Sequence, residues 1–179
     1  MVRNDRGLFS ATSARVAQAA RDSARELTEQ GIQFALIGGL AVNAHGRPRA
    51  TTDVDYIVPR DAQEHLGVGG ALSRRLGVVT LDYDGISVDC LLVRDLFLLA
   101  ELDTPVMVEG FPVVSVEALV YLKLIANRNR DERDIIDLIE SGINTESVKA
   151  YLGENAPSLV EDFEQVVAIA RMDRRGKHR

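Results

Sequence analysis

The chain has few cysteine and tryptophan residues. Among its 179 residues there is one cysteine, Cys90, and no tryptophan. A single cysteine excludes an internal disulfide and every zinc site built from paired cysteines. No apolar run approaches the ~20 residues that a membrane helix needs, and residues 1–23 lack the apolar core of a secretory signal. We therefore expect a cytoplasmic protein with no membrane partner.

Positive charge is also scarce: the chain has 21 Lys and Arg residues and 27 Asp and Glu residues, which gives a net charge of −6. This balance disfavours a protein that coats nucleic acid non-specifically. It leaves room for an enzyme that grips one nucleotide or one RNA end locally. The basic tail "RMDRRGKHR", from Arg171, is typical of a solvated terminus.

The first two thirds of the sequence predict a small mixed sheet with few helices. We expect a helix over residues 10–30, a strand over 32–39, a short helix over 40–45 and a strand over 52–59. Asp61 is the expected cap of a helix through His65, interrupted near "GVGG". Two hairpins are expected, turning at Asp84-Gly85 and Glu109-Gly110, with a short helix over 94–102 between them.

From residue 115 the pattern becomes helical. Two helices fit residues 115–142, with a break near 127–130, and two more begin at Asn144 and Ser158. The predicted class is α+β. We expect an α/β core with an N-terminal helix over residues 1–114 and a helical region over 115–179, packed as one compact unit.

Two carboxylates stand one residue apart in the second predicted strand, "TDVDYIVP". Asp53 and Asp55 would point to the same face of the sheet, about 6.5–7 Å apart. Two anions on one face repel unless a cation lies near them, and Mg²⁺ prefers one or two carboxylates with phosphate oxygens. The alternative is that both acids lie at an exposed strand end and pair with Arg47 or Arg49.

Three further features bear on this choice. Gly38-Gly39 ends one strand and begins a helix, where backbone N–H groups can approach a phosphate, although a glycine pair also makes a tight turn. Asp89 lies in the β-branched run "ISVDCLLV" and would join the other acids if its strand pairs with theirs. Lys123 interrupts the apolar helix "EALVYLKLIA", either for a function or by snorkelling to the surface.

These residues resemble the nucleotidyltransferase superfamily of polymerase-beta-like enzymes. The pattern is Gly-Gly, 13 residues, Asp-x-Asp and a later strand acid. The stretch "ALIGGLAVNAHGRPRATTDVDYIV" is similar to the AbiEii/AbiGii-type toxin nucleotidyltransferase-like proteins. So is a later helical motif with Lys123, Arg128, Asp131 and Asp134. The resemblance spans roughly residues 30–140, and Gly39 replaces the serine found in many superfamily members.

The resemblance implies NTP as substrate and two Mg²⁺ ions. Gly38 and Gly39 would hold the triphosphate, Asp53 and Asp55 would bind Mg²⁺, and Asp89 would bind the second ion and activate an acceptor hydroxyl. Lys123 would contact the phosphates.

Other residues of the same motifs have open roles. Arg49 and Thr52, like Arg47 and Thr51, would bind phosphate or staple their loop. His45 would be a base or a hydrogen-bonded structural residue. Arg128, Asp131 and Asp134 would line the cleft or form a surface ion-pair ladder.

Three functions fit the sequence. The first is a Mg²⁺-dependent nucleotidyltransferase acting on an RNA or protein hydroxyl, as the toxin of a pair with an antitoxin protein. The second is a nucleotide-binding module of the same fold without turnover. The third is a transferase for small molecules such as antibiotics, against which the lack of an aromatic cluster counts, since the chain has five Phe, four Tyr and no Trp.

Overall fold

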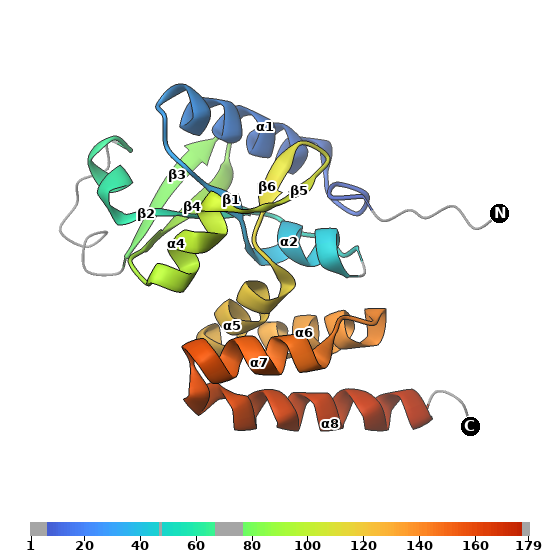
Figure 1. Ribbon diagram of the computed structural model, residues 1–179. Helices are drawn as coiled ribbons and strands as arrows, with labels where there is room; N and C mark the ends of the chain where they lie inside the picture. The colour runs from blue at the N-terminus through green and yellow to red at the C-terminus, as the bar shows by residue number, and fades with distance from the viewer. Residues whose placement is uncertain (1–6, 47, 67–76, 177–179) are drawn as a thin grey trace. The chain divides into compact units, whose positions relative to one another are not determined.

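The chain folds into two compact units. The computed structural model describes residues 7–46, 48–66 and 77–176. The first unit runs to Val114, and the second contains residues 45–47 and everything from Ser115. The first unit holds a six-stranded mixed sheet and the second is helical, so the predicted α+β class is confirmed (Figure 1). None of the helices in the described ranges combines the length and hydropathy of a membrane span.

The first unit alternates strands with short helices. Its elements are α1 (Ala14–Glu29), β1 (Ala35–Leu36), α2 (Gly38–His45), β2 (Val54–Pro59), the 3₁₀ helix η1 (Arg60–Glu64), β3 (Val78–Tyr83), β4 (Ile86–Val93), α4 (Leu96–Asp103), β5 (Val106–Val108) and β6 (Phe111–Val113). The strand order is β3-β4-β2-β1-β6-β5. The central pair β2 and β4 is parallel, whereas the pairs β1–β2, β3–β4 and β5–β6 are antiparallel.

The two faces of the sheet differ because side chains alternate along each strand. Tyr56 and Cys90 are buried on the face covered by α1, where the Tyr56 hydroxyl lies 3.1 Å from the Ser23 hydroxyl. Helix α4 lies on the other side of the sheet (Figure 1). Asp55 and Asp89 belong to this second face and stay partly exposed.

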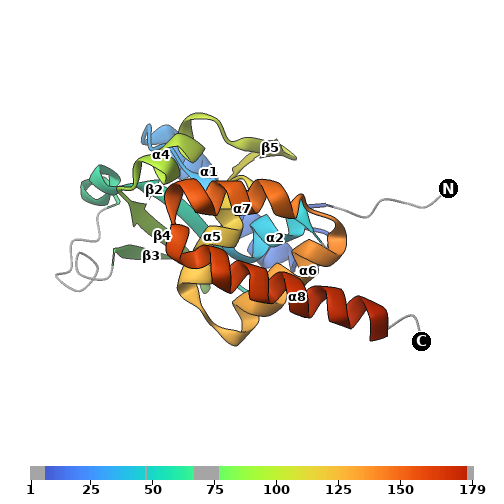
Figure 2. The ribbon, with the colours of Figure 1, turned by 60° about the horizontal axis from the view of Figure 1, so that its bottom comes forward.

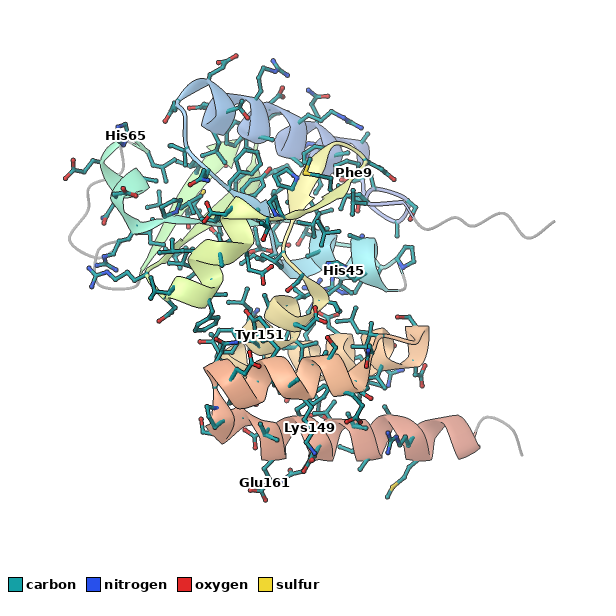
Figure 3. All side chains as sticks on the ribbon, in the orientation of Figure 1. Phe9, His45, His65, Lys149, Tyr151 and Glu161 are labelled. Atoms are coloured by element: carbon teal, nitrogen blue, oxygen red, sulfur yellow. The ribbon has the colours of Figure 1, made fainter. Side chains whose placement is uncertain are left out.

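Both predicted hairpins are confirmed. Asp84 and Gly85 have φ values of 54° and 76°, and Glu109 and Gly110 have 51° and 84°. Positive φ at both central residues is the geometry of a two-residue turn whose twist matches the strands it joins. Phe9 of the N-terminal segment packs edge-on against Phe111 of β6, with ring centroids 5.3 Å apart, beside the second hairpin (Figure 3).

The second unit is built from α5 (Val116–Ala126), α6 (Asn129–Ser141), α7 (Thr145–Asn155), the 3₁₀ helix η2 (Pro157–Leu159) and α8 (Val160–Gly176). Helices α7 and α8 lie side by side (Figure 2). Asn144 caps α7 as predicted, since its side chain accepts hydrogen bonds from Glu146 N and Ser147 N. Asn127 adopts a left-handed backbone conformation, which ends α5 and separates it from α6.

Four local predictions need correction. The first strand has only two residues, because Gly38, with φ of 61°, turns the chain directly into α2. Asp61 caps nothing: η1 begins at Arg60, so Asp61 lies inside its first turn. Ser158 does not start α8, because Pro157 opens a 3₁₀ turn before it. The first helix begins at Ala14 with Ser13 as its cap, four residues later than expected. The interruption at residues 67–70 lies outside the described residues.

Candidate functional site

The two glycines at the start of α2 lie against three residues of the predicted site, Arg49, Thr51 and Asp55. A Cβ atom on Gly38 would lie 1.9 Å from Asp55 Oδ2, and one on Gly39 would lie 2.5 Å from Thr51 Oγ1 and 3.3 Å from Arg49 Nη1. No side chain fits in either place. The glycines therefore let the N-terminal turn of α2 approach both the acidic strand and the loop before it.

Two of the three predicted acids are direct neighbours in the sheet. Asp55 of β2 and Asp89 of β4 are register partners on parallel strands. Neighbouring strands lie about 4.8 Å apart, so the two side chains share one face at close range. The pairing on which the convergence of the acids depended is thus present. Asp53 precedes β2 by one residue and is also partly exposed.

Hydroxyl groups hold two of these carboxylates. Thr51 Oγ1 donates to Asp53 Oδ1 at 2.8 Å. Thr80 Oγ1 donates to Asp89 Oδ1 at 2.6 Å, and Ser87 Oγ approaches the same oxygen at 3.3 Å. Each acid is therefore oriented by a residue on its own face of the sheet or in the adjoining loop.

The buried Cys90 thiol follows Asp89 in the sequence and is affected by the charge of the acids. Burial raises the pKa of Cys90 to about 12, and the charges of Asp89 and Asp55 act in the same direction. Its side chain lies on the opposite face from the acids, because it follows Asp89 by one residue. The negative charge of the acids would attract a cation to their own, partly exposed face of the sheet.

The donor set suits a hard cation. It consists of carboxylate and hydroxyl oxygens, and the side chain that Gly38 lacks would fill the space beside Asp55. In the described ranges, no group of three or more His, Cys, Asp or Glu side chains is arranged to hold a metal ion. A Mg²⁺ ion bound by two carboxylates, with phosphate and water oxygens completing its shell, needs no such group. The residues present fit that mode, and ligation by all three acids stays a prediction.

The backbone of Arg49 is held in place by the buried side-chain amide of Asn43, a residue that was not among the predicted site residues. The Arg49 N–H donates to Asn43 Oδ1 at 2.8 Å, and Asn43 Nδ2 donates to the Arg49 carbonyl at 3.0 Å. Asn43 is fully buried in α2. It ties the loop that carries Arg49 to the helix that begins with the glycines. Thr52 is exposed, and Arg47 lies outside the described residues.

Lys123 belongs to the second unit, where it makes two ion pairs. Its ammonium lies 2.9 Å from Asp131 Oδ1 and 2.6 Å from Asp134 Oδ2, and all three residues are buried. The snorkelling interpretation is therefore wrong. Arg128 Nε adds a contact of 2.6 Å to Asp131 Oδ2. The two acids of the predicted surface ladder are only 1% exposed, whereas Arg128, which pairs with Asp131 at i, i+3 spacing, is exposed as that interpretation expected.

The two cations act on the ionisation of Asp131. Burial acts to raise the pKa of the Asp131 carboxyl, but hydrogen bonds from Arg128 and Lys123 outweigh it and hold that pKa below its usual value. Lys123 and the exposed Arg128 thus both pair with Asp131, and Lys123 also pairs with Asp134. Contact of Lys123 with phosphate stays a prediction, and so does a role as base for His45, the partly buried last residue of α2 (Figure 3).

The missed residues left signals in the sequence. Asn43 is polar within the otherwise apolar "GGLAVNA". Thr80 could be found by counting, because a two-residue turn at Asp84-Gly85 pairs residue 83 with 86 and therefore 80 with 89. Ser87 follows from strand alternation, since it lies two residues before Asp89.

Several solved structures are similar to this chain, and three of them follow. An antigenic nucleotidyltransferase-like protein from Paracoccidioides brasiliensis aligns with a TM-score of 0.47 and 16% identity, over 86% of this chain and 94% of that one. The antibiotic-resistance factor ANT(2'')-Ia aligns in its solution structure with a TM-score of 0.44 and 19% identity, over 92% and 96%. Its crystal structure with adenylyl-2''-tobramycin gives a TM-score of 0.40 and 20% identity, over 90% and 99%.

No protein-family model matches the sequence, and no curated protein matches it significantly. Structural likeness at 16–20% identity assigns no activity and no residue role to this chain.

Proposed function

We propose that the chain is a Mg²⁺-dependent nucleotidyltransferase, which moves a nucleoside monophosphate from an NTP to a hydroxyl group of an RNA or protein acceptor. The close approach of Gly38 to the Asp55 carboxylate, which leaves no room for a Cβ atom between them, carries the proposal. It places the N-terminus of a helix, which attracts phosphate, beside a carboxylate that attracts a cation. A nucleoside triphosphate bound with Mg²⁺ requires both features at one place.

Each residue of the site has a role in this reaction. Backbone N–H groups at Gly38 and Gly39, with Arg49 and Thr52, would bind the triphosphate. Asp53 and Asp55 would hold Mg²⁺, and Asp89 would also reach a second ion. Bound there, Mg²⁺ would neutralise charge that develops on the phosphates.

The transfer itself exchanges one phosphorus–oxygen bond for another. The acceptor oxygen bonds to the α-phosphorus while the bond from that phosphorus to the pyrophosphate oxygen breaks. Pyrophosphate leaves with the electron pair, and Asp89 takes the proton of the acceptor hydroxyl. A carboxylate within hydrogen-bond reach of a hydroxyl suits this task.

The test uses the full chain with each α-labelled NTP, Mg²⁺, and either total RNA or cell lysate. We expect label to reach an RNA or protein acceptor and to be lost with EDTA. Asp53→Asn and Asp55→Asn should each abolish transfer. Asp61→Asn is the matched control, because Asp61 is an exposed acid of the same unit outside the site, and it should leave transfer unchanged.

Two other outcomes would redirect the assignment. An NTP that raises Tm in the presence of Mg²⁺ but is never transferred would indicate a nucleotide-binding module without turnover. Transfer to aminoglycoside-like small molecules, and to no RNA or protein, would indicate a small-molecule enzyme. The toxin role adds one expectation, that expression arrests growth and Asp55→Asn relieves the arrest, with an antitoxin protein as the natural partner.

A further inference from the structure

Asp89 is restrained from two strands at the same oxygen. Thr80 of β3 donates to Asp89 Oδ1 at 2.6 Å, and Ser87 of β4 lies 3.3 Å from that atom. Among the described residues no hydrogen bond is made to Oδ2. The carboxylate therefore has one oxygen engaged by the protein and one available to another group.

We propose that Thr80 is a positioning residue for the acceptor step, which it serves by fixing the orientation of the Asp89 carboxylate, with Oδ1 held by the protein and Oδ2 turned toward the acceptor. The inference rests on the proposed function. A short hydrogen bond to a charged acceptor is among the stronger ones in proteins, and a catalytic base loses much of its effect when it is held in the wrong orientation.

The fold does not need this hydroxyl group. Thr80 is exposed and its partner Asp89 is already fixed in register by the β3–β4 pairing, which follows from the turn at Asp84-Gly85. Valine has the same shape and is equally suited to a strand. Thr80→Val therefore removes the hydrogen bond and leaves the strand pairing in place.

The experiment compares Thr80→Val, Thr80→Ser and Ser87→Ala in the full chain. Thr80→Val should lower the transfer rate about ten- to a hundredfold at saturating NTP. The Kd of a non-transferable NTP analogue with Mg²⁺ should stay within about twofold of wild type. Thr80→Ser should restore most of the rate, and Ser87→Ala should have a smaller effect because its contact is longer. Thr28→Val, which removes an exposed hydroxyl bonded to the Ala24 carbonyl, should change nothing.

A double-mutant cycle shows whether Thr80 acts through Asp89. In an Asp89→Ala background, Thr80→Val should cause no further loss of rate, because the group that Thr80 orients is gone. A further loss as large as in the wild type would overturn the proposal, as would a wild-type rate for Thr80→Val alone.

Crystal structures of the wild type and Thr80→Val give a readout that does not depend on activity. The Asp89 carboxylate should lie against Thr80 in the wild type and turn away in the variant; an unchanged carboxylate would overturn the proposal. Failure of the proposed function looks different: the wild type itself would transfer nothing, and Asp55→Asn would not alter NTP binding.

Discussion

Replacement of Lys123 by methionine tests whether this lysine holds the second unit together or binds a phosphate. Methionine keeps most of the side-chain volume and removes the charge. It would leave the carboxylates of Asp131 and Asp134, which Lys123 contacts at 2.9 and 2.6 Å, buried with one cation fewer. Removing one partner of a buried ion pair costs about 3–5 kcal/mol, since the remaining charge is left without compensation.

For a chain of this size, that loss corresponds to a fall in Tm of roughly 6–20 °C. Urea unfolding followed by circular dichroism at pH 7 would measure it, with an unchanged m-value as evidence that only stability has changed. Lys123→Met/Asp134→Asn should be less destabilised than the sum of the two single variants by about 1 kcal/mol or more, because charge balance is partly restored.

Lys149 provides the matched control. It forms an ion pair with Glu164 in the same unit, but on the exposed surface of α7 and α8 (Figure 3). Exposed ion pairs contribute little, so Lys149→Met should unfold close to the wild type. If Lys123→Met unfolds like the wild type and instead weakens NTP binding, the structural role is refuted and contact with phosphate is favoured.

The same prediction has a pH dependence of known sign. The pKa of Asp131 is lowered in the folded chain, so its ion pairs stabilise the fold above the unfolded pKa, about 3.9, and this contribution disappears as pH falls through the folded pKa. The difference in stability between wild type and Lys123→Met should therefore be full at pH 7 and shrink below about pH 4. A difference that grows on acidification would contradict the assignment of charges.

Three further predictions follow from the first unit. Gly38→Ala should destabilise the protein by about 1 kcal/mol or more beyond Gly31→Ala: both glycines have positive φ, but only at Gly38 would the new Cβ strike Asp55. Thermal denaturation of both variants gives the comparison. Equal falls in stability would show that the Asp55 side chain moves aside without cost. With its pKa raised to about 12, the native Cys90 thiol should react with iodoacetamide at pH 8 roughly a thousandfold more slowly than a free thiol; mass spectrometry follows the labelling, and fast labelling would contradict the burial. Asn43→Ala should lower the free energy of unfolding in urea by about 1–3 kcal/mol, because the buried Asn43 amide loses two part-buried hydrogen bonds to the Arg49 backbone, and a neutral result would show that the loop is held by other contacts.

Local features of the fold could be predicted because short-range chemistry determines them. Asp84-Gly85 adopts the positive φ values that such a pair favours, and Glu109-Gly110 adopts the same turn geometry. Asn144 caps α7 because its short side chain reaches the first free N–H groups of the helix. Each of these outcomes depends on residues within a few positions of one another.

Long-range pairing could not be predicted in the same way. That Asp55 and Asp89 are partners depends on parallel pairing between strands more than 30 residues apart, with β3 between them in the sequence. Strand alternation gives the face of each acid but not its neighbour. The sequence therefore supported only a conditional prediction: the acids converge if these two strands pair.

Lys123 shows a different limit. An isolated lysine in an apolar helix has the same local pattern whether it snorkels, binds a ligand or meets buried acids. Its partners lie eight and eleven residues further on, across the left-handed Asn127. The spacing of Asp131 and Asp134, with Ile135 and Leu138 buried on the same helix, was compatible with inward-facing acids but did not identify their partner.

The candidate site depends on the registers of two separate strand pairings. Parallel pairing of β2 with β4 brings Asp55 to Asp89, and antiparallel pairing of β3 with β4 brings Thr80 to Asp89. A shift of one residue in either pairing would move the partner side chain to the other face of the sheet, where Tyr56 and Cys90 are buried. Burial of that apolar face therefore opposes any slip of the strands. The same packing that stabilises the first unit thus fixes which side chains face Asp89.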